Sequence, residues 1–217
     1  FVTPHPKDLS PEVIRAFADL EVLCPRLHLP LQAGSDRVLE RMGRKYDSAR
    51  YLQLVRDLRS ARPDIALSTD LIVGFPGETE EDFLATCRMV EKAGFVSSFS
   101  FCYSDRPGAR AALLPDKIPR DVKLERLSRL QARQDALGQA WLESRTGQET
   151  VVLLEGQSRK TDASAPAETS WQGHDPYGAT VNVSLPPGAG AVGRMTPVRI
   201  ITAKRHSLLA QQAGTPW

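Results

Sequence analysis

The segment from His28 to Asp36 has residues that could hold a ligand. It is an apolar stretch that turns through small polar residues into a predicted helix, and Gln32 and Ser35 offer an amide and a hydroxyl for hydrogen bonds. The same residues also fit a structural role, in which Ser35 or Asp36 caps the helix and Gln32 closes the turn. Taken alone, their chemistry favours the structural role.

A second segment, from Asp70 to Thr79, is suited to close contact with a small molecule. Its two glycines let a backbone approach a ligand, and the free amides at the start of the following helix favour polar or anionic groups. The segment lacks the lysine and the spacing of a nucleotide P-loop, so it could also be only a tight strand-to-helix connection. The candidate binding residues are Gly74, Phe75, Pro76, Gly77 and Glu78.

A third segment runs from Phe101 to Gly108. Tyr103 offers a ring for stacking, Ser104 a hydroxyl and Arg106 a permanent cation. Each of them could equally belong to an ordinary turn. No single segment identifies a reaction. The function of each segment therefore depends on the helices and strands that position it.

The pattern around these segments predicts a parallel sheet covered by helices. From Ser10 to about Arg145, stretches of helical period alternate with short β-type runs. In such α/β folds the ligand site lies at the carboxyl ends of the strands, which is where the three segments fall. Thr79 is a predicted helix N-cap and Gly94 a predicted helix end. We expect helices at 11–20, 36–42, 48–61, 80–93 and 121–144, and strands at 65–73 and 97–103.

The long predicted helix at 121–144 leads to a second, β-rich domain. After Gly147, short β-type runs alternate with turns rich in Gly, Pro and Ser, which predicts a small β-barrel. The polar stretch 157–170 is expected to be a mobile loop between two strands. The helix should turn Val122, Leu127, Leu130, Leu137 and Trp141 toward the core. The strands are expected at 150–154, 179–183 and 197–202, and the two domains at 1–141 and 142–211.

Composition limits the class of protein. The 217 residues, 41% hydrophobic and 25% charged, are typical of a globular protein, and 28 basic against 26 acidic residues leave a formal charge of +2, so any RNA site must be local. Because no apolar run approaches the roughly 20 residues of a membrane span, we expect a cytoplasmic protein without a membrane partner. Cys24, Cys87 and Cys102 lie far apart, as reduced thiols do more often than disulfide or metal-site cysteines.

In this order and spacing, the segments closely resemble the methylthiotransferase branch of the radical SAM superfamily. Two positions depart from the family pattern, Ala33 where serine is usual and Ala109 where threonine is usual. The matching motifs are Thr-Pro-His-Pro at 3–6, His-Leu-Pro-Leu-Gln-x-Gly-Ser-Asp at 28–36, Met-x-Arg-x-Tyr at 42–46, Asp-x-Ile-Val-Gly-Phe-Pro-Gly-Glu-Thr at 70–79 and Tyr-Ser-x-Arg-Pro-Gly at 103–108. A further likeness at 154–160 and 181–183 extends the resemblance over nearly the whole chain.

The resemblance implies an α/β fold, the C-terminal part of a radical SAM (β/α) partial barrel, followed by a small all-β, OB-like TRAM barrel that binds tRNA. It also implies that Gln32, Ser35, residues 74–78, Tyr103 and Arg106 line an S-adenosylmethionine pocket. Basic residues on the barrel could instead form only a solvated face. The implied RNA-binding residues are Ser158, Arg159, Lys160, Arg194 and Lys204, with Arg145 and Arg205 as further phosphate contacts.

Within the family, the likeness is to enzymes acting on tRNA. These replace hydrogen by a methylthio group at C2 of N6-dimethylallyladenosine beside the anticodon, using S-adenosylmethionine and two [4Fe-4S] clusters. The chain has no Cys-x-x-x-Cys-x-x-Cys loop and begins at Phe1. We therefore expect a monomeric C-terminal fragment, inactive alone, that exposes surfaces normally covered by missing strands, and we assign it no catalytic or metal-binding residue.

Other functions remain open. The chain could be a module that binds RNA without radical chemistry, or part of a methylthiotransferase for a different tRNA adenosine or a ribosomal protein. It could also belong to another (β/α) barrel enzyme that uses a metal or a sugar phosphate, with His5 and His28 as candidate ligands.

Overall fold

The chain divides into two compact units. The computed structural model describes residues 4–158 and 169–215. Unit 1 is Phe1–Leu137 and unit 2 is Gly138–Trp217, so the division falls inside the long helix α5 (Arg120–Ser144). The structure thus divides the chain shortly before the predicted boundary at 141/142, and the predicted domain extents remain predictions.

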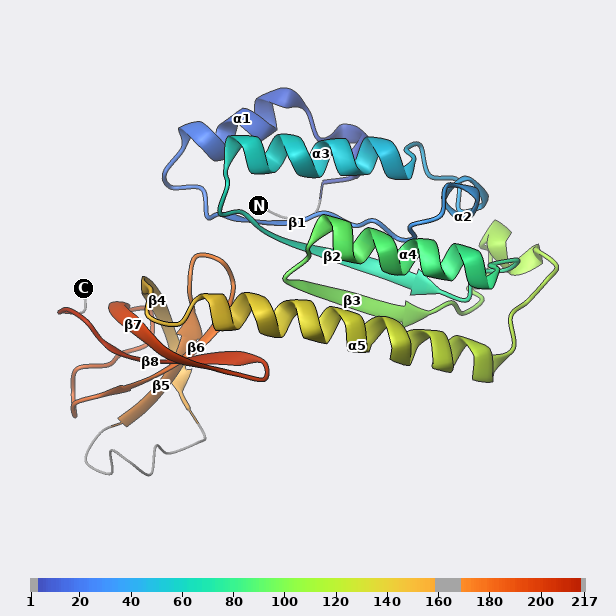
Figure 1. Ribbon diagram of the computed structural model, residues 1–217. Helices are drawn as coiled ribbons and strands as arrows, with labels where there is room; N and C mark the ends of the chain where they lie inside the picture. Colours follow the sequence, from blue (N-terminus) through green and yellow to red (C-terminus); the bar gives the residue numbers. More distant parts are fainter. Residues whose placement is uncertain (1–3, 159–168, 216–217) are drawn as a thin grey trace. The chain divides into compact units, whose positions relative to one another are not determined.

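Unit 1 is built on a three-stranded parallel sheet in the order β1-β2-β3 (Figure 1). The central strand pairs with both neighbours, with Leu67 opposite Leu27 and Asp70 opposite Phe99. Parallel strands joined through helices give the α/β architecture that the sequence predicted. The strands are β1 (Arg26–His28), β2 (Ala66–Val73) and β3 (Ser97–Cys102).

Three of the helices of unit 1, α1, α3 and α4, lie on one face of the sheet (Figure 1). The predicted caps of α4 are confirmed: Thr79 and Asp82 form a reciprocal capping box, and Gly94 ends the helix with φ at 58°. The elements outside the sheet and before α5 are the 3-10 helices η1 (Pro6–Asp8) and η2 (Arg110–Leu113) and the α-helices α1 (Pro11–Asp19), α2 (Asp36–Arg41), α3 (Ser48–Ala61) and α4 (Glu80–Ala93).

The two faces of the sheet differ in chemistry. Along β2, Leu67, Thr69, Leu71 and Val73 are buried under the helices. The residues between them, Ser68, Asp70 and Ile72, are half-buried on the other face. Phe99 and Phe101 of β3 share that other face through their register with β2, and they are 60% and 56% exposed. The sheet face away from the helices therefore exposes two apolar rings, and the expectation that missing strands normally cover such surfaces stays a prediction.

The buried stripe of α5 is more polar than its sequence suggested. Leu130 is fully buried as predicted, and the other predicted core residues of this helix are half-buried. Arg126 and Gln134, one turn to either side of Leu130, are 6% and 5% exposed. Gln134 donates a hydrogen bond to the Phe95 carbonyl at 2.8 Å, which gives this buried amide a partner.

Unit 2 is a closed five-stranded barrel with strand order β4-β5-β6-β8-β7. All its neighbouring strands are antiparallel except β6 and β8, which are parallel. The strand interiors pack a single core that includes Val152, Val181, Val183 and Leu208. The strands are β4 (Glu149–Gln157), β5 (Thr169–His174), β6 (Thr180–Leu185), β7 (Met195–Lys204) and β8 (Ser207–Gln212).

The barrel prediction is confirmed, but two of its strands were missed. The sequence predicted neither β5 nor β8, and the predicted loop 157–170 was wrong at both ends, where Gln157 closes β4 and Thr169 opens β5. The middle of that stretch, 159–168, lies outside the described residues. A polar strand such as β5 forms because β4 and β6 supply hydrogen-bond partners on both sides, which a local sequence pattern cannot reveal.

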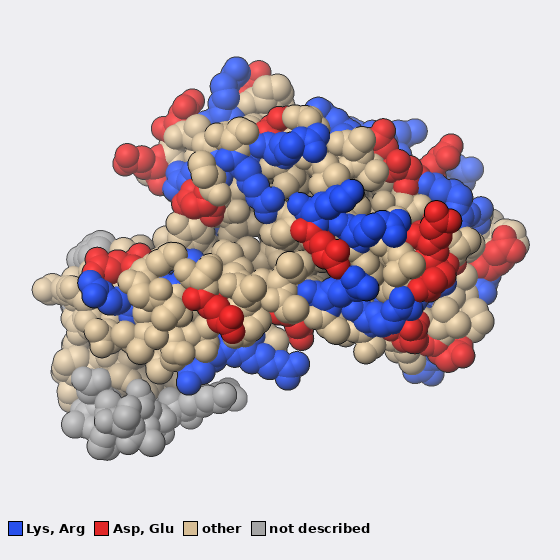
Figure 2. Space-filling model, viewed as in Figure 1, with Lys and Arg blue, Asp and Glu red and all other residues tan. Residues whose placement is uncertain are grey.

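The described helices include none that is both long enough and apolar enough to span a membrane. On the face drawn in Figure 2, basic and acidic side chains are intermixed, as the near balance of charges predicts. Any electrostatic site therefore depends on a local group of residues.

Candidate functional site

Unit 1 contains a cavity of about 1090 Å³ at the carboxyl ends of β2 and β3. It brings together residues from all three segments that the sequence singled out: Gln32 from the first, Phe75 from the second, and Tyr103 and Arg106 from the third. The remaining lining residues come mainly from the end of α2 and from the loop around η2. They are Glu40, Arg41, Met42, Gly43, Arg44, Ile72, Phe101, Cys102, Ser104, Ala109, Arg110, Ala111, Leu113 and Leu114.

Gln32 lies at the inner wall of this cavity in an unusual backbone conformation. Its φ is 71°, in the left-handed region that costs a non-glycine residue roughly 1 kcal/mol or more. Two hydrogen bonds to β2 hold it there: its amide donates to the Asp70 carbonyl at 2.8 Å and its carbonyl accepts from Ile72 at 2.9 Å. Within the described part of the chain its side-chain amide has no hydrogen-bond partner, so it is available to a ligand.

Two aromatic rings form another part of the wall. Phe75 and Tyr103 meet edge to face with ring centroids 5.1 Å apart. The Tyr103 hydroxyl donates to Asp105 at 2.9 Å, and Lys117 Nζ lies 5.3 Å from the Tyr103 ring centroid. Such a pair of rings can stack against a heterocycle while the free side-chain amide of Gln32 forms hydrogen bonds with the edge of that heterocycle.

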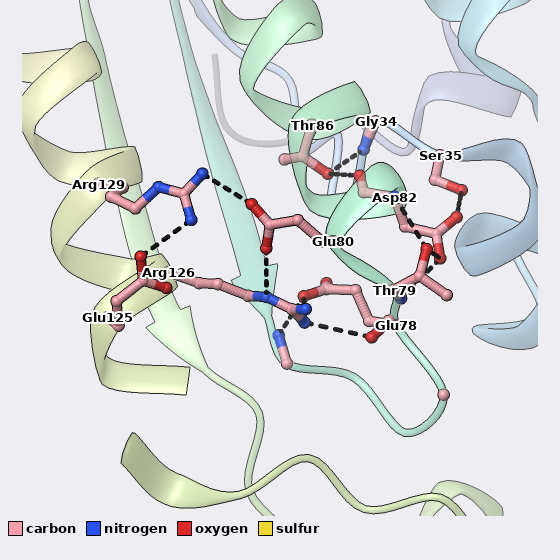
Figure 3. Close-up of polar contacts among 12 residues, drawn as sticks. Gly34, Ser35, Glu78, Thr79, Glu80, Asp82, Thr86, Glu125, Arg126 and Arg129 are labelled. Carbon is pink, nitrogen blue, oxygen red and sulfur yellow. Dashed lines mark hydrogen bonds and ion pairs between the residues drawn. The ribbon is translucent and has the colours of Figure 1, made fainter. Parts of the chain in front are cut away.

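Ser35 does not line the cavity. It caps α2 by accepting a hydrogen bond from the Val38 amide at 3.4 Å, and its hydroxyl donates to Asp82 at 2.5 Å (Figure 3). Asp82 also accepts from the Thr79 amide at 2.8 Å and is paired with Arg37. Burial opposes its ionisation, but these hydrogen bonds outweigh burial and hold the pKa of Asp82 well below its ordinary value of 3.8.

Asp82→Asn is expected to lower the free energy of unfolding by about 2 kcal/mol at neutral pH, because charge-assisted hydrogen bonds from Ser35, Thr79 and Arg37 are weakened. A carboxyl with a depressed pKa stabilises the fold above its ordinary pKa and loses that effect as the pH falls. The deficit of the variant should therefore shrink below pH 3.8, as urea denaturation at several pH values would measure. The exposed Asp64→Asn is the control, and an equal loss from it would contradict the expectation.

Most residues of the second segment, Asp70 to Thr79, have a structural role. The Glu78 side chain is 1% exposed, accepts from the Gly74 amide at 2.9 Å and pairs with Arg126 at 2.8 Å (Figure 3). Burial raises the pKa of Glu78 despite that partner. Gly74 and Gly77 have φ of 70° and 78°, which a turn of this shape requires, and Pro76 is buried within it. Of these candidate residues, 74–78, only Phe75 lines the cavity.

The sequence named His28 as a candidate ligand but did not predict the polar group that this residue forms on the exposed sheet face. His28 lies between Ser68 and Asp70, with Nδ1 3.0 Å from Ser68 Oγ and Nε2 3.3 Å from Asp70 Oδ1. The Phe99 ring meets His28 edge to face at 5.9 Å. The signal was the alternation of polar and buried residues along β2, which is typical of a strand with two different faces.

The metal-site alternative gains no support from this geometry. His28 is held by Ser68 and Asp70, while His5 packs against Tyr46 with ring centroids 5.4 Å apart. Among residues 4–158 and 169–215, no group of three or more His, Cys, Asp or Glu side chains could hold a metal ion. Cys24 is exposed, Cys87 buried and Cys102 half-buried.

The predicted RNA-binding residues of the barrel have different surroundings. Ser158 follows β4, and its hydroxyl lies 3.4 Å from Asn182 Oδ1; Arg159 and Lys160 lie outside the described residues. Arg194 and Lys204 are exposed.

Arg145, a further phosphate candidate, was wrongly interpreted. It is 5% exposed and pairs with Asp175 at 3.0 Å inside unit 2. A guanidinium committed to a buried carboxylate cannot contact a phosphate. Arg205 is exposed at the turn between β7 and β8 and stays a candidate.

Comparison with known proteins gives a consistent result. Residues 1–90 match the family model of the radical SAM superfamily. Over 217 residues the chain is 62% identical to the tRNA-2-methylthio-N(6)-dimethylallyladenosine synthase of Nitratidesulfovibrio vulgaris strain DP4, covering 100% of this chain and 48% of the relative. The protein of the same name from Lawsonia intracellularis is 54% identical over 211 residues, covering 97% of this chain and 46% of that protein. The chain thus spans about half the length of these relatives.

Among solved structures, the chain resembles coproporphyrinogen III oxidase (HemN) from Escherichia coli, described as a radical SAM enzyme. The TM-score is 0.50 at 16% sequence identity, and the match covers 79% of this chain and 45% of that one. A likeness at this identity concerns the fold alone.

Proposed function

We propose that this chain, which belongs to the radical SAM methylthiotransferase family, is part of an enzyme that methylthiolates C2 of N6-dimethylallyladenosine beside the anticodon of tRNA. The observation that carries the proposal is the 62% identity over the whole chain to a relative named for that product. Such an enzyme would act in the cytoplasm, and we propose that the chain itself is a monomer.

The cavity of unit 1 is the proposed S-adenosylmethionine site. The adenine would stack on Phe75 and Tyr103 and receive hydrogen bonds from the free amide of Gln32. When a [4Fe-4S] cluster reduces S-adenosylmethionine, the molecule supplies a radical. The three cysteines, in their separate surroundings, do not fit a cluster site, so the two clusters of such an enzyme would need ligands from elsewhere, and we expect no cleavage of S-adenosylmethionine by this chain alone.

The barrel of unit 2 is the proposed TRAM domain, which would bind tRNA. Ser158, Arg194 and Lys204 are candidate contacts on it, together with Arg159 and Lys160 from the sequence. Small closed β-barrels commonly bind oligonucleotides, which supports this assignment.

Tyr103→Leu is expected to weaken S-adenosylmethionine binding by about tenfold, since an aromatic stacking partner is typically worth roughly 1–3 kcal/mol. Titration calorimetry on the 217-residue chain would measure it. Phe99→Leu, which removes an aromatic ring outside the cavity lining, is the matched control. If Tyr103→Leu binds S-adenosylmethionine as tightly as the unchanged chain, the proposal that the cofactor binds in this cavity is wrong.

Binding of an RNA stem–loop to the chain tests the tRNA part of the proposal. We expect binding that weakens as salt increases, measured by the anisotropy of a fluorescein-labelled RNA. RNA binding without any affinity for S-adenosylmethionine would favour an RNA-binding module without radical chemistry. A chain that binds no RNA would contradict both functions.

A further inference from the structure

We propose that four arginines lining the cavity of unit 1, Arg41, Arg44, Arg106 and Arg110, bind backbone phosphates of the RNA substrate. This inference rests on the proposed function and deepens it, because it adds an RNA contact in unit 1 to the one proposed on the barrel. It also gives Arg106, which the sequence assigned to the cofactor, a different ligand.

The four arginines share the absence of a protein partner. Within the described residues, none of their guanidinium groups makes a hydrogen bond or an ion pair. By contrast, Arg37, Arg126 and Arg145 each pair with a carboxylate. The cavity lining contains a single acidic residue, Glu40, against these four cations. The lining therefore has an excess of positive charge that the protein itself does not neutralise.

Arg44 lacks a partner even at the buried part of its side chain. Its Nε is buried without any hydrogen-bond partner, although the side chain as a whole is only half-buried. A buried guanidinium N–H that lacks an acceptor costs roughly 1–3 kcal/mol. Of the Arg44 nitrogens only Nε is buried without a partner, so the other two can donate two parallel hydrogen bonds to phosphate oxygens.

The charge of the lining favours RNA over the cofactor as the partner of these arginines. S-adenosylmethionine carries a sulfonium and an ammonium against one carboxylate, so several guanidinium groups repel it overall. An RNA strand carries a negative charge at every phosphate. Phe101, 56% exposed, lines the same cavity, and an exposed ring beside cations is typical of surfaces that bind single-stranded nucleic acid.

The cavity has room for this arrangement. Its volume of about 1090 Å³ lies just above the roughly 300–1,000 Å³ range of small-molecule sites. Gln32 and Phe75 are buried, whereas Arg41, Arg106 and Arg110 are exposed. A cofactor on the buried side would thus leave the exposed side to the RNA.

The test measures the affinity of the 217-residue chain for a fluorescein-labelled RNA stem–loop over a series of KCl concentrations. The double variant Arg44→Gln, Arg106→Gln should bind about tenfold more weakly at low salt, and its slope of log K against log salt should fall by roughly 0.7 for each phosphate that the variant no longer neutralises. Lysines at the same two positions should restore most of the slope, because they keep the charge.

The matched control is Arg50→Gln, Arg88→Gln. It removes two exposed arginines that lie outside the cavity and whose guanidinium groups, like those of the four, have no partner among the described residues. If the two glutamine pairs change the affinity and the salt slope equally, the inference is overturned, while RNA binding by the unchanged chain still supports the proposed function. A chain that binds no RNA would overturn both. Loss of S-adenosylmethionine binding with unchanged RNA binding would assign the arginines to the cofactor instead.

Folding is the remaining control. Because the removed groups have no partners, the melting temperature should not fall. If Arg44→Gln does unfold the chain, the exposed pair Arg106→Gln, Arg110→Gln decides the question by the same slope measurement.

Discussion

Arg126→Met is expected to lower the free energy of unfolding of unit 1 by about 3–5 kcal/mol, the usual cost of breaking a buried ion pair from one side. The Arg126 and Glu78 side chains are 7% and 1% exposed, and Nη1 lies 2.8 Å from the Glu78 carboxylate. Methionine fills much of the space but leaves that carboxylate buried without a counter-ion. Far-UV ellipticity during urea unfolding is the measurement, because α1 to α4 lie in unit 1.

Two controls separate the missing charge from the lost side chain. Arg129→Met, on the same helix, breaks pairs with Glu80 and Glu125 but is 37% exposed, so it should cost no more than about 1 kcal/mol. Adding Glu78→Gln to Arg126→Met should recover a large part of the loss, since a neutral amide can still accept from Gly74. If the double variant is no more stable than Arg126→Met, packing rather than charge explains the effect.

The pH dependence gives an independent signature. Burial already raises the pKa of Glu78 above its ordinary value of 4.5, and removal of Arg126 should raise it further. A carboxyl with a raised pKa stabilises the fold when protonated and loses that effect as the pH rises through its folded-state pKa. The deficit of Arg126→Met relative to the unchanged chain should therefore be largest at neutral pH and shrink as the pH falls toward 4.5.

Arg145→Met should have an effect of similar size, about 3–5 kcal/mol, in unit 2. Asp175 is fully buried, and besides Arg145 at 3.0 Å it accepts from the amides of Tyr177 and Ala179. The Arg145 guanidinium carbon also lies 4.2 Å from the Tyr177 ring centroid. Tryptophan fluorescence should report this loss selectively, since Trp141 and the other tryptophans all belong to unit 2.

The exposed pair between Arg199 and Glu149, with side chains 55% and 63% exposed, provides the comparison within the barrel. Arg199→Met should change stability by less than about 1 kcal/mol. If Arg145→Met and Arg199→Met lower the free energy of unfolding equally, the buried ion pair stabilises the barrel no more than the exposed one does.

Local sequence signals predicted unit 1 better than the barrel. Thr79 and Gly94 delimit α4 because a capping box and a left-handed glycine are short-range chemistry. The strand β5 carries no comparable signal: only Trp171 and Gly173 are buried in it, and its partners β4 and β6 hold it in place. Its existence depends on barrel closure, which local periodicity does not encode.

The candidate site was predictable as a set of segments but not residue by residue. Gln32, Phe75 and Tyr103 do meet at one cavity, because the carboxyl ends of parallel strands lie at one edge of a sheet. Glu78, from the same motif as Phe75, turns instead to Arg126, which is 48 residues away. Such a partner follows from tertiary packing, and nothing near Glu78 in the sequence indicates it.

The edge strand β3 also affects how the chain behaves as a laboratory sample. One side of β3 has no strand partner among the described residues, and Phe99 and Phe101 add two largely exposed rings beside that edge. An unpaired, apolar edge is a template for pairing with the same edge of another molecule, and a net charge of only +2 gives little long-range repulsion between molecules. Concentrated stocks should thus form strand-paired aggregates on storage, so dilute, freshly prepared solutions suit the binding and unfolding measurements best.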